Sequence, residues 1–200
     1  MARSASDSAR ARLIAAAKAL FAHSGFEQSS TAAIARDAET SESQLVRYFG
    51  SKAGLLEAIF EEAWVPLNAR VHDLLADARS GRDAVGGVLA AVLAAFERDD
   101  QLATIFLFEG RRIRGGEHTV QLSSGFLEFT DIIHRLIKRG QKDGSFAPSF
   151  DSGALAAALM GACEAMVRER VLAKRAGTRR VYSDKQVLKI FDAMLNGLAP

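Results

Sequence analysis

Cysteine and long apolar runs are scarce in this 200-residue chain, and each scarcity excludes something. The single cysteine, Cys163, cannot form an internal disulfide, which favours a reducing cytoplasm. No apolar run approaches the roughly 20 residues that a membrane-spanning helix requires. Residues 1–7 are small and polar, without the apolar segment of a secretory signal. We therefore expect a cytoplasmic protein that is not embedded in a membrane.

Net charge says little about the binding partner. Lysine and arginine number 26 and aspartate and glutamate number 24, so the formal net charge is +2. Because nucleic-acid affinity rests on the neutralisation of phosphates, a strongly basic chain would be a clearer sign of that partner. The charge therefore permits nucleic-acid binding without indicating it.

Helical periodicity dominates the chain. Only three prolines interrupt it, and apolar residues recur at spacings of three and four without a strand-like alternation. Leu13, Ala17 and Leu20, for example, share one face of the first predicted helix. Pro66 is expected to kink or interrupt the fourth helix. The pattern predicts an all-α fold of about nine helices.

Serine and aspartate mark the start of several helices, because their side chains cap the first free N–H groups. Ser30 is placed to begin a second helix over about 31–38. Ser41 and Gln44 have the spacing of a capping box, which predicts a third helix over about 41–49. Further N-caps are expected at Ser51 and Ser183, and Asp151 is expected to open the eighth helix.

The second and third predicted helices, joined by a tight turn and preceded by a supporting helix, have the pattern of a helix-turn-helix. On the third helix Leu45 and Phe49 face the core, whereas Ser43 and Arg47 point nearly the opposite way. Arginine pairs with guanine, glutamine with adenine and serine with either base, so this face can read a major groove. The residues expected to contact DNA are Thr31, Ser41, Ser43, Gln44, Arg47, Tyr48 and Lys52.

Some of these residues have simpler explanations. Gln44 can serve the capping box instead of reading a base, and a place at the start of a helix by itself explains Thr31. Tyr48 and Lys52 lie at the end of the third helix and just beyond it, where hydroxyl and ammonium groups suit phosphates.

Four segments, in order along the chain, resemble the TetR family of regulators. They are Arg12–Ala17, Leu20–Phe26, Ser30–Arg36 and Leu45–Leu56, and the similarity spans roughly residues 8–65. The resemblance implies a DNA-binding domain at 8–52 and a helical domain at 53–200 that binds an effector and dimerises. It further implies a ligand-responsive repressor that binds a palindromic operator as a dimer.

Three positions depart from the family pattern. Glu39 stands in the turn where the family usually has glycine, and a left-handed conformation there costs a non-glycine residue about 1 kcal/mol. Ser43 replaces a second glycine and adds a hydroxyl that can contact DNA. Val46 stands where the family often has an aromatic phosphate contact, which shifts that role toward Tyr48 and Lys52.

The last two predicted helices offer a dimer interface. Small residues line the eighth helix at Ala154, Ala158, Gly161 and Ala165. The ninth helix adds an apolar face of Val187, Ile190, Phe191, Met194 and Leu198. Packing within one chain explains the same pattern, but the resemblance favours a homodimer through these two helices.

Aromatic residues between the helix-turn-helix and the final helices favour a small-molecule pocket. The residues expected to line it are Trp64, Phe96, Phe106, Phe126, Phe129, Glu128 and Met160. Ordinary core packing is the alternative explanation for each of them, and the effector itself is not identified by the sequence.

Two rival functions remain open. An enzyme is one, because Asp131 and His134 lie one helical turn apart and Cys163 is a candidate nucleophile. No metal-binding pair, phosphate loop or nucleophile elbow occurs in the sequence, so we expect no catalytic site, metal or cofactor. The other is a DNA-binding regulator that has no small-molecule effector.

Overall fold

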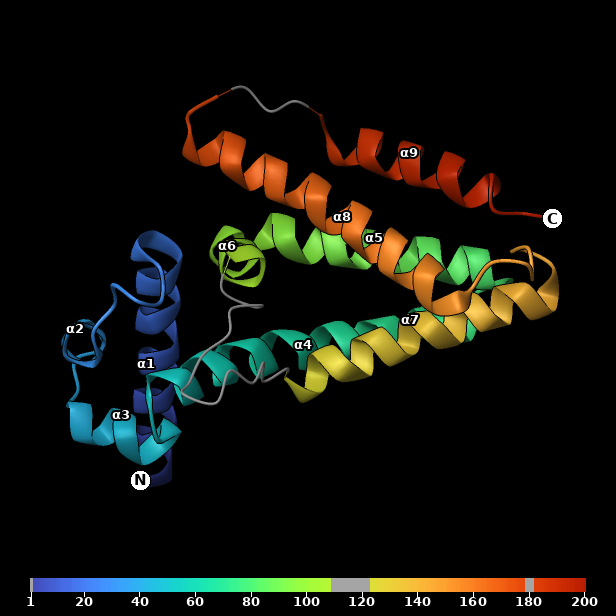
Figure 1. Ribbon diagram of the computed structural model, residues 1–200. Coiled ribbons are helices and arrows are strands. Elements are labelled where there is room, and N and C mark those ends of the chain that lie inside the picture. Colours follow the sequence, from blue (N-terminus) through green and yellow to red (C-terminus); the bar gives the residue numbers. More distant parts are fainter. Residues whose placement is uncertain (1, 109–122, 179–181) are drawn as a thin grey trace. The chain divides into compact units, whose positions relative to one another are not determined.

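The structure is a computed structural model that describes residues 2–108, 123–178 and 182–200 (Figure 1). These residues form nine helices and no strand, which confirms the predicted all-α fold. The helices are α1 (Ala2–Ser24), α2 (Thr31–Asp37), α3 (Glu42–Phe49), α4 (Lys52–Asp77), α5 (Gly81–Arg98), α6 (Asp100–Phe108), α7 (Ser124–Asp143), α8 (Ser152–Arg175) and α9 (Asp184–Asn196). Within this part of the chain, no helix has both the length and the apolarity to cross a membrane.

The expected capping residues begin their helices. The hydroxyl of Ser30 accepts a hydrogen bond from the backbone N–H of Ala33 (3.1 Å), and that of Ser41 accepts one from Gln44 (3.3 Å). Ser51, Asp151 and Ser183 cap α4, α8 and α9 in the same way. α4 continues through Pro66 as one helix, so the proline does not interrupt it. The kink expected at Pro66 stays a prediction.

The described chain divides into two compact units. The first, here called the head, comprises the residues up to Ala63 and the described residues of Gln101–Ser123. The second, the body, comprises Trp64–Asp100 and the described residues of Ser124–Pro200. α4 therefore contributes to both units, and most of α6 packs in the head although it follows α5 in the sequence. The division predicted between residues 52 and 53 remains a prediction about the extent of the DNA-binding domain.

The head is built around one apolar core. Leu13, Phe21, Ile34 and Leu45 are fully buried in it, so α1, α2 and α3 all contribute. Ile105 of α6 is equally buried in the same cluster. Burial of a side chain of this size contributes about 1.5–3 kcal/mol. The core therefore holds α3 through the fully buried Leu45 and the half-buried Tyr48 and Phe49, and leaves the face of Ser43 and Arg47 exposed.

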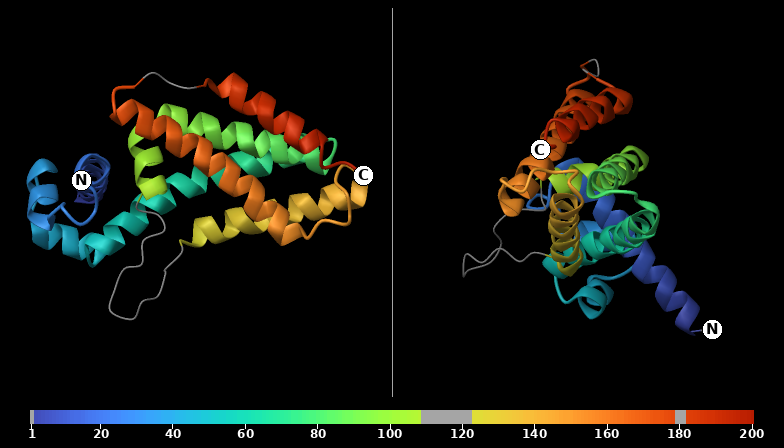
Figure 2. Two further views of the ribbon diagram at one scale, coloured as in Figure 1. Left: turned by 45° about the horizontal axis from the view of Figure 1, so that its top comes forward. Right: turned by 90° about the vertical axis from the view of Figure 1, so that its right-hand side faces the viewer.

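The body consists of long helices, among which α7 packs on both α5 and α8 while α5 also packs on α9 (Figure 2). Its buried side chains include Ile132 and Ile137 of α7. At the contact between α5 and α7, the backbones approach each other closely at two glycines. A Cβ on Gly81 would overlap the backbone of Gly140, and one on Gly140 would overlap the ring of Phe146. Gly81 therefore allows the close approach of α5 to α7, and Gly140 leaves room for the ring of Phe146, which follows α7.

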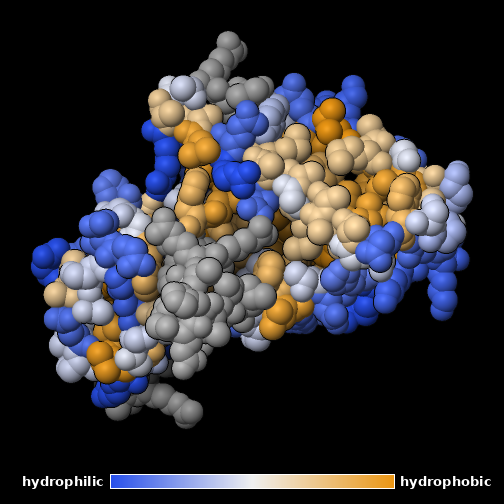
Figure 3. All heavy atoms as spheres, viewed as in Figure 1, coloured by the Kyte–Doolittle hydropathy of each residue, from blue (hydrophilic) through white to orange (hydrophobic). Residues whose placement is uncertain are grey.

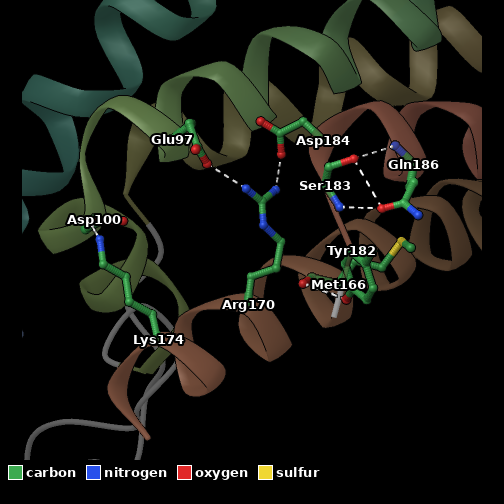
Figure 4. A network of polar contacts seen from close by, with 9 residues as sticks. All are labelled: Glu97, Asp100, Met166, Arg170, Lys174, Tyr182, Ser183, Asp184 and Gln186. Atoms are coloured by element: carbon green, nitrogen blue, oxygen red, sulfur yellow. Dashed lines mark hydrogen bonds and ion pairs between the residues drawn. The ribbon is translucent and has the colours of Figure 1, made fainter. Parts of the chain in front are cut away.

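A polar network attaches α9 to the rest of the body (Figure 4). The guanidinium of Arg170 on α8 lies between the carboxylates of Glu97 on α5 (2.5 Å) and Asp184 in the first turn of α9. Since the Arg170 side chain is only 10% exposed, the two carboxylates offset its loss of hydration. Partial burial raises the pKa of Tyr182 to about 12, so its hydroxyl stays protonated and donates to the Met166 carbonyl (2.9 Å).

Substitution of Gly81 tests the close approach of α5 and α7. We expect Gly81→Ala to lower the free energy of unfolding by about 1–3 kcal/mol, because the added methyl group meets backbone atoms that cannot move aside. Gly87→Ala on the same helix is the matched control, since nothing lies within 4 Å of its Cβ position. The control should gain about 0.5–1 kcal/mol from better helix propensity. Urea unfolding measures both, and equal stability of the two variants would contradict the close approach.

Candidate nucleic-acid interface

The turn between α2 and α3 sets the direction of the third helix. It is a Schellman motif, in which Thr40 N–H donates to the Ala35 carbonyl (2.9 Å) and Glu39 N–H donates to the Arg36 carbonyl (3.0 Å). The motif places Glu39 in the left-handed region, at a φ of 51°. The same motif ends α8, where Gly177 takes this position at a φ of 64°. The structure thus confirms a left-handed non-glycine residue at this turn.

The third helix, α3, has a buried face and an exposed face. Leu45 is completely buried, and Phe49 packs half-buried against the head core. Ser43 and Arg47 are exposed, and Val46 is exposed over 53% of its surface. The arrangement confirms the orientation predicted from the helical spacing of these residues.

Hydrogen bonds restrain the polar side chains of the exposed face. The hydroxyl of Thr40 donates to the amide oxygen of Gln44 (2.6 Å), so only the Ser41 half of the expected capping box forms. Arg47 donates to the phenolic oxygen of Tyr48 (3.1 Å), and its guanidinium lies 5.0 Å from the centre of that ring. Gln44 therefore keeps its NH₂ group for a further acceptor, and Arg47 keeps most of its N–H donors.

Glu42 also belongs to this face, although the sequence pattern did not single it out. The hydroxyl of Thr31 donates to its carboxylate (2.5 Å), which links the start of α2 to the start of α3. Base contacts of a recognition helix come from its N-terminal residues, and Glu42 directly follows the N-cap Ser41. Its position near the start of α3 could therefore have identified Glu42 from the sequence. We did not expect it to contact DNA, because a carboxylate is repelled by phosphate.

Lys52, in the first turn of α4, is hydrogen-bonded to the head's own backbone. Its ammonium group donates to the carbonyls of Phe26 (2.9 Å) and Ser29 (3.0 Å) and lies 4.3 Å from the centre of the Phe26 ring. These contacts tie the segment between α1 and α2 to the start of α4. The phosphate contact expected of Lys52 remains a prediction, and the residue also has a structural role in the head.

Four of the residues expected to line a ligand pocket come together in the body. The ring centre of Trp64 on α4 lies 5.7 Å from that of Phe126 and 5.0 Å from that of Phe129, both on α7. Glu128 joins them through Asn68, whose amide donates to its carboxylate (3.0 Å). Asn68 was not identified from the sequence. Its pattern could have indicated a buried polar residue, because it lies one helical turn after Trp64 on an apolar face.

The other three expected pocket residues are Phe106, Phe96 and Met160. Phe106 belongs to the head, where its ring meets that of Phe60 edge-on at 5.1 Å. Phe96 on α5 and Met160 on α8 are half-buried. Elsewhere in the body, a polar pocket of about 340 Å³ has none of the expected residues in its wall. Its charged lining residues are Asp77, Arg79, Arg82, Asp83 and Asp192.

The residues behind the enzyme alternative do not form a reactive group. Burial raises the pKa of the Cys163 thiol to about 12, which keeps it protonated and a poor nucleophile at neutral pH. Asp131 is paired with Arg135 (2.7 Å) on the same helix. Among the described residues, no group of three metal-binding side chains is close enough to hold an ion.

Comparison with known proteins agrees with this geometry. Residues 13–59 match the family model described as "Bacterial regulatory proteins, tetR family". The nucleoid occlusion factor SlmA of Aliivibrio fischeri strain MJ11 is 29% identical over 157 residues, which cover 76% of this chain and 78% of that protein.

Two solved structures share the fold over nearly the whole chain. The fatty acid degradation regulator FadR from Bacillus halodurans has a TM-score of 0.81 at 18% identity and covers 93% of this chain and 97% of its own. The transcriptional regulator FadR from Bacillus subtilis in complex with stearoyl-CoA has a TM-score of 0.79 at 18% identity, with coverages of 94% and 96%.

A helix-turn-helix with an exposed, polar third helix, at the start of an all-helical chain, defines a DNA-binding transcriptional regulator. The family match covers most of this head, including the whole of α2 and α3. The head of the chain is thus similar to the tetR family of bacterial regulatory proteins.

Replacement of Glu39 tests the strain at the turn. Glu39→Gly should raise the free energy of unfolding by about 1 kcal/mol, because glycine adopts the left-handed conformation without steric cost. Glu27→Gly is the matched control, since Glu27 is also an exposed turn residue of the head but does not have a positive φ. The control should be neutral or destabilising. If thermal unfolding finds Glu39→Gly no more stable than Glu27→Gly, the turn is not strained.

Proposed function

We propose that the chain is a repressor that binds a palindromic operator as a homodimer and releases it when a small molecule binds the body. The exposed polar face of α3 carries the proposal. Because Leu45 fixes the helix from the opposite side, this face can enter the major groove, which is about 12 Å wide.

Ser43, Gln44 and Arg47 are the proposed base-reading residues. Arg47 offers a planar fork of N–H donors that pairs with O6 and N7 of guanine. Adenine needs both a donor and an acceptor from glutamine, but Thr40 already uses the amide oxygen of Gln44. Gln44 therefore favours an acceptor on the base, such as N7 of a purine, and the exposed Val46 suits a thymine methyl group.

Thr31, Ser41, Tyr48 and Lys52 are the proposed phosphate contacts, which position α3 without reading sequence. One of them must exchange its partner when DNA binds. A phosphate has to replace the Glu42 carboxylate as acceptor for Thr31. The ammonium of Lys52 has three N–H donors, so it can donate to a phosphate while keeping both of its backbone carbonyls.

The proposed dimer forms through α8 and α9, where apolar side chains are exposed. Leu172 of α8 and Ile190 of α9 are about half exposed, and Met194 is nearly so. Figure 3 shows apolar surface over the region of these two helices. The small residues predicted to allow close packing, at Ala154, Ala158, Gly161 and Ala165, are exposed as well. A large exposed apolar patch on a single chain is typical of an interface.

The expected apolar face of α9 has two parts. Val187 and Phe191 are buried against their own chain, whereas Ile190 and Met194 are exposed. One side of α9 thus anchors the helix and the other supports the proposed contact with a second copy.

The effector is proposed to bind in the body near the cluster of Trp64, Phe126 and Phe129. The Bacillus subtilis protein of the same fold was solved in complex with stearoyl-CoA, which supports a ligand in this fold. An effector that favours a dimer with a different spacing of its two heads lowers operator affinity, since half-sites lie about 34 Å or a multiple apart.

Removal of Arg47 tests base reading. Arg47→Ala should relax the preference at one base pair in each half-site by about 1–3 kcal/mol, because the bidentate contact is lost. Arg36→Ala is the matched control, since Arg36 is an exposed arginine of α2 that pairs with Asp37. Titration of the operator and its single-base variants measures the preference. An Arg47→Ala protein with unchanged base preference would place base reading elsewhere.

A charge in the exposed face of α9 tests the dimer. Ile190→Glu should shift the protein to a monomer and weaken binding to a palindromic operator more than tenfold, because a charge cannot be buried there unpaired. Leu127→Glu, at an equally exposed leucine of α7, should stay dimeric. Sedimentation equilibrium reports the oligomeric state. A dimeric Ile190→Glu protein would rule out this interface.

A further inference from the structure

A buried side chain between α4 and α7 has an acceptor that nothing satisfies. Asn68 is only 3% exposed, and its amide oxygen is buried and accepts no hydrogen bond from any described residue. Folded proteins pair the large majority of their buried polar groups, since an unpaired one loses its hydration without compensation. The oxygen of Asn68 is therefore available to a donor from outside the described residues.

The neighbours of Asn68 fix which way its amide points. Its nitrogen donates to the Gly125 carbonyl (3.0 Å) and to the Glu128 carboxylate (3.0 Å). If the amide were turned over, its oxygen would face two acceptors, so only the present orientation is satisfied. The nitrogen thus holds α4 to α7, and the oxygen takes no part in that contact.

The surroundings of Asn68 are aromatic. Trp64 lies one helical turn before it on α4 and packs against Phe126 and Phe129 of α7. At this point the helices are close together, because a Cβ on Gly125 would overlap the side chain of Trp64. A ligand whose donor reaches Asn68 has an apolar part that can contact these rings.

A half-exposed pair of side chains connects Asn68 to the surface. The second carboxylate oxygen of Glu128 lies 3.3 Å from the imidazole of His72, which is one helical turn beyond Asn68. Both side chains are about half exposed. The half-exposed Glu128 carboxylate therefore links the buried amide to the surface.

We propose that Asn68 is the polar anchor of an effector site, and that the effector carries a hydroxyl or N–H donor on an apolar body. The inference rests on the proposed function, in which the body takes an effector. The Asn68 oxygen and the Glu128 carboxylate are both acceptors, so an anionic head group next to them is disfavoured. The expected ligand class therefore differs in charge from stearoyl-CoA, an anion.

The test uses 1-octanol, its methyl ether and octanoate as probes on the full-length chain. Trp64 is the only tryptophan, so its fluorescence reports binding at this cluster directly. We expect 1-octanol to bind the natural protein about tenfold more tightly than the ether, which has no donor, and octanoate to bind more weakly than 1-octanol. In Asn68→Leu the difference between alcohol and ether should fall to about onefold, with ether affinity retained.

Equal affinity for the alcohol and the ether in the natural protein would overturn the assignment of Asn68. That result needs no variant, so it stands even if Asn68→Leu does not fold. If the alcohol and the ether bind equally and still release operator DNA, Asn68 is not the anchor, but the chain is still a ligand-responsive regulator. If no probe changes Trp64 fluorescence, the anchor is overturned as well, and a screen for any small molecule that releases the operator then decides the proposed function separately.

Discussion

The burial of Leu45 is the interaction on which the DNA-reading surface depends. α3 is only eight residues long, and a helix this short is not stable in water by itself. The head core holds it by one completely buried leucine, and the Ser41 cap satisfies its first turn. At about 100° per residue, the burial of Leu45 turns Ser43 and Arg47 outward, so the core determines what the helix presents.

The polar side chains of the head and of the body differ in their hydrogen-bond partners. In the head, Gln44 and Arg47 are already hydrogen-bonded to neighbours on their own face, which reduces the side-chain entropy lost when DNA binds. In the body, Arg170 is paired with two carboxylates, whereas the oxygen of Asn68 accepts no hydrogen bond from the described residues. The hydrogen-bonded side chains of the head are thus held ready for DNA. In the body, Arg170 is a structural contact, whereas Asn68 belongs to the proposed ligand site.

Local sequence patterns predicted much of this architecture, because caps and helical spacing act over three or four residues. The caps at Ser30, Ser41 and Ser183 and the inward direction of Leu45 are of this kind. Contacts between segments that are distant in the sequence could not be predicted from such short patterns. The ammonium of Lys52 meets carbonyls 23 and 26 residues away, and the ring of Phe106 on α6 meets that of Phe60 on α4. Both depend on how helices pack, which no local pattern records.

The central claim is that α3 reads a two-fold symmetric DNA sequence. Its most direct test is to incubate the unmodified protein with random DNA fragments and to sequence those it retains. The account predicts enrichment of a palindrome with half-sites about 10 base pairs, or a multiple of that, apart. Retained fragments with no enriched sequence, or with a single asymmetric site, would contradict it.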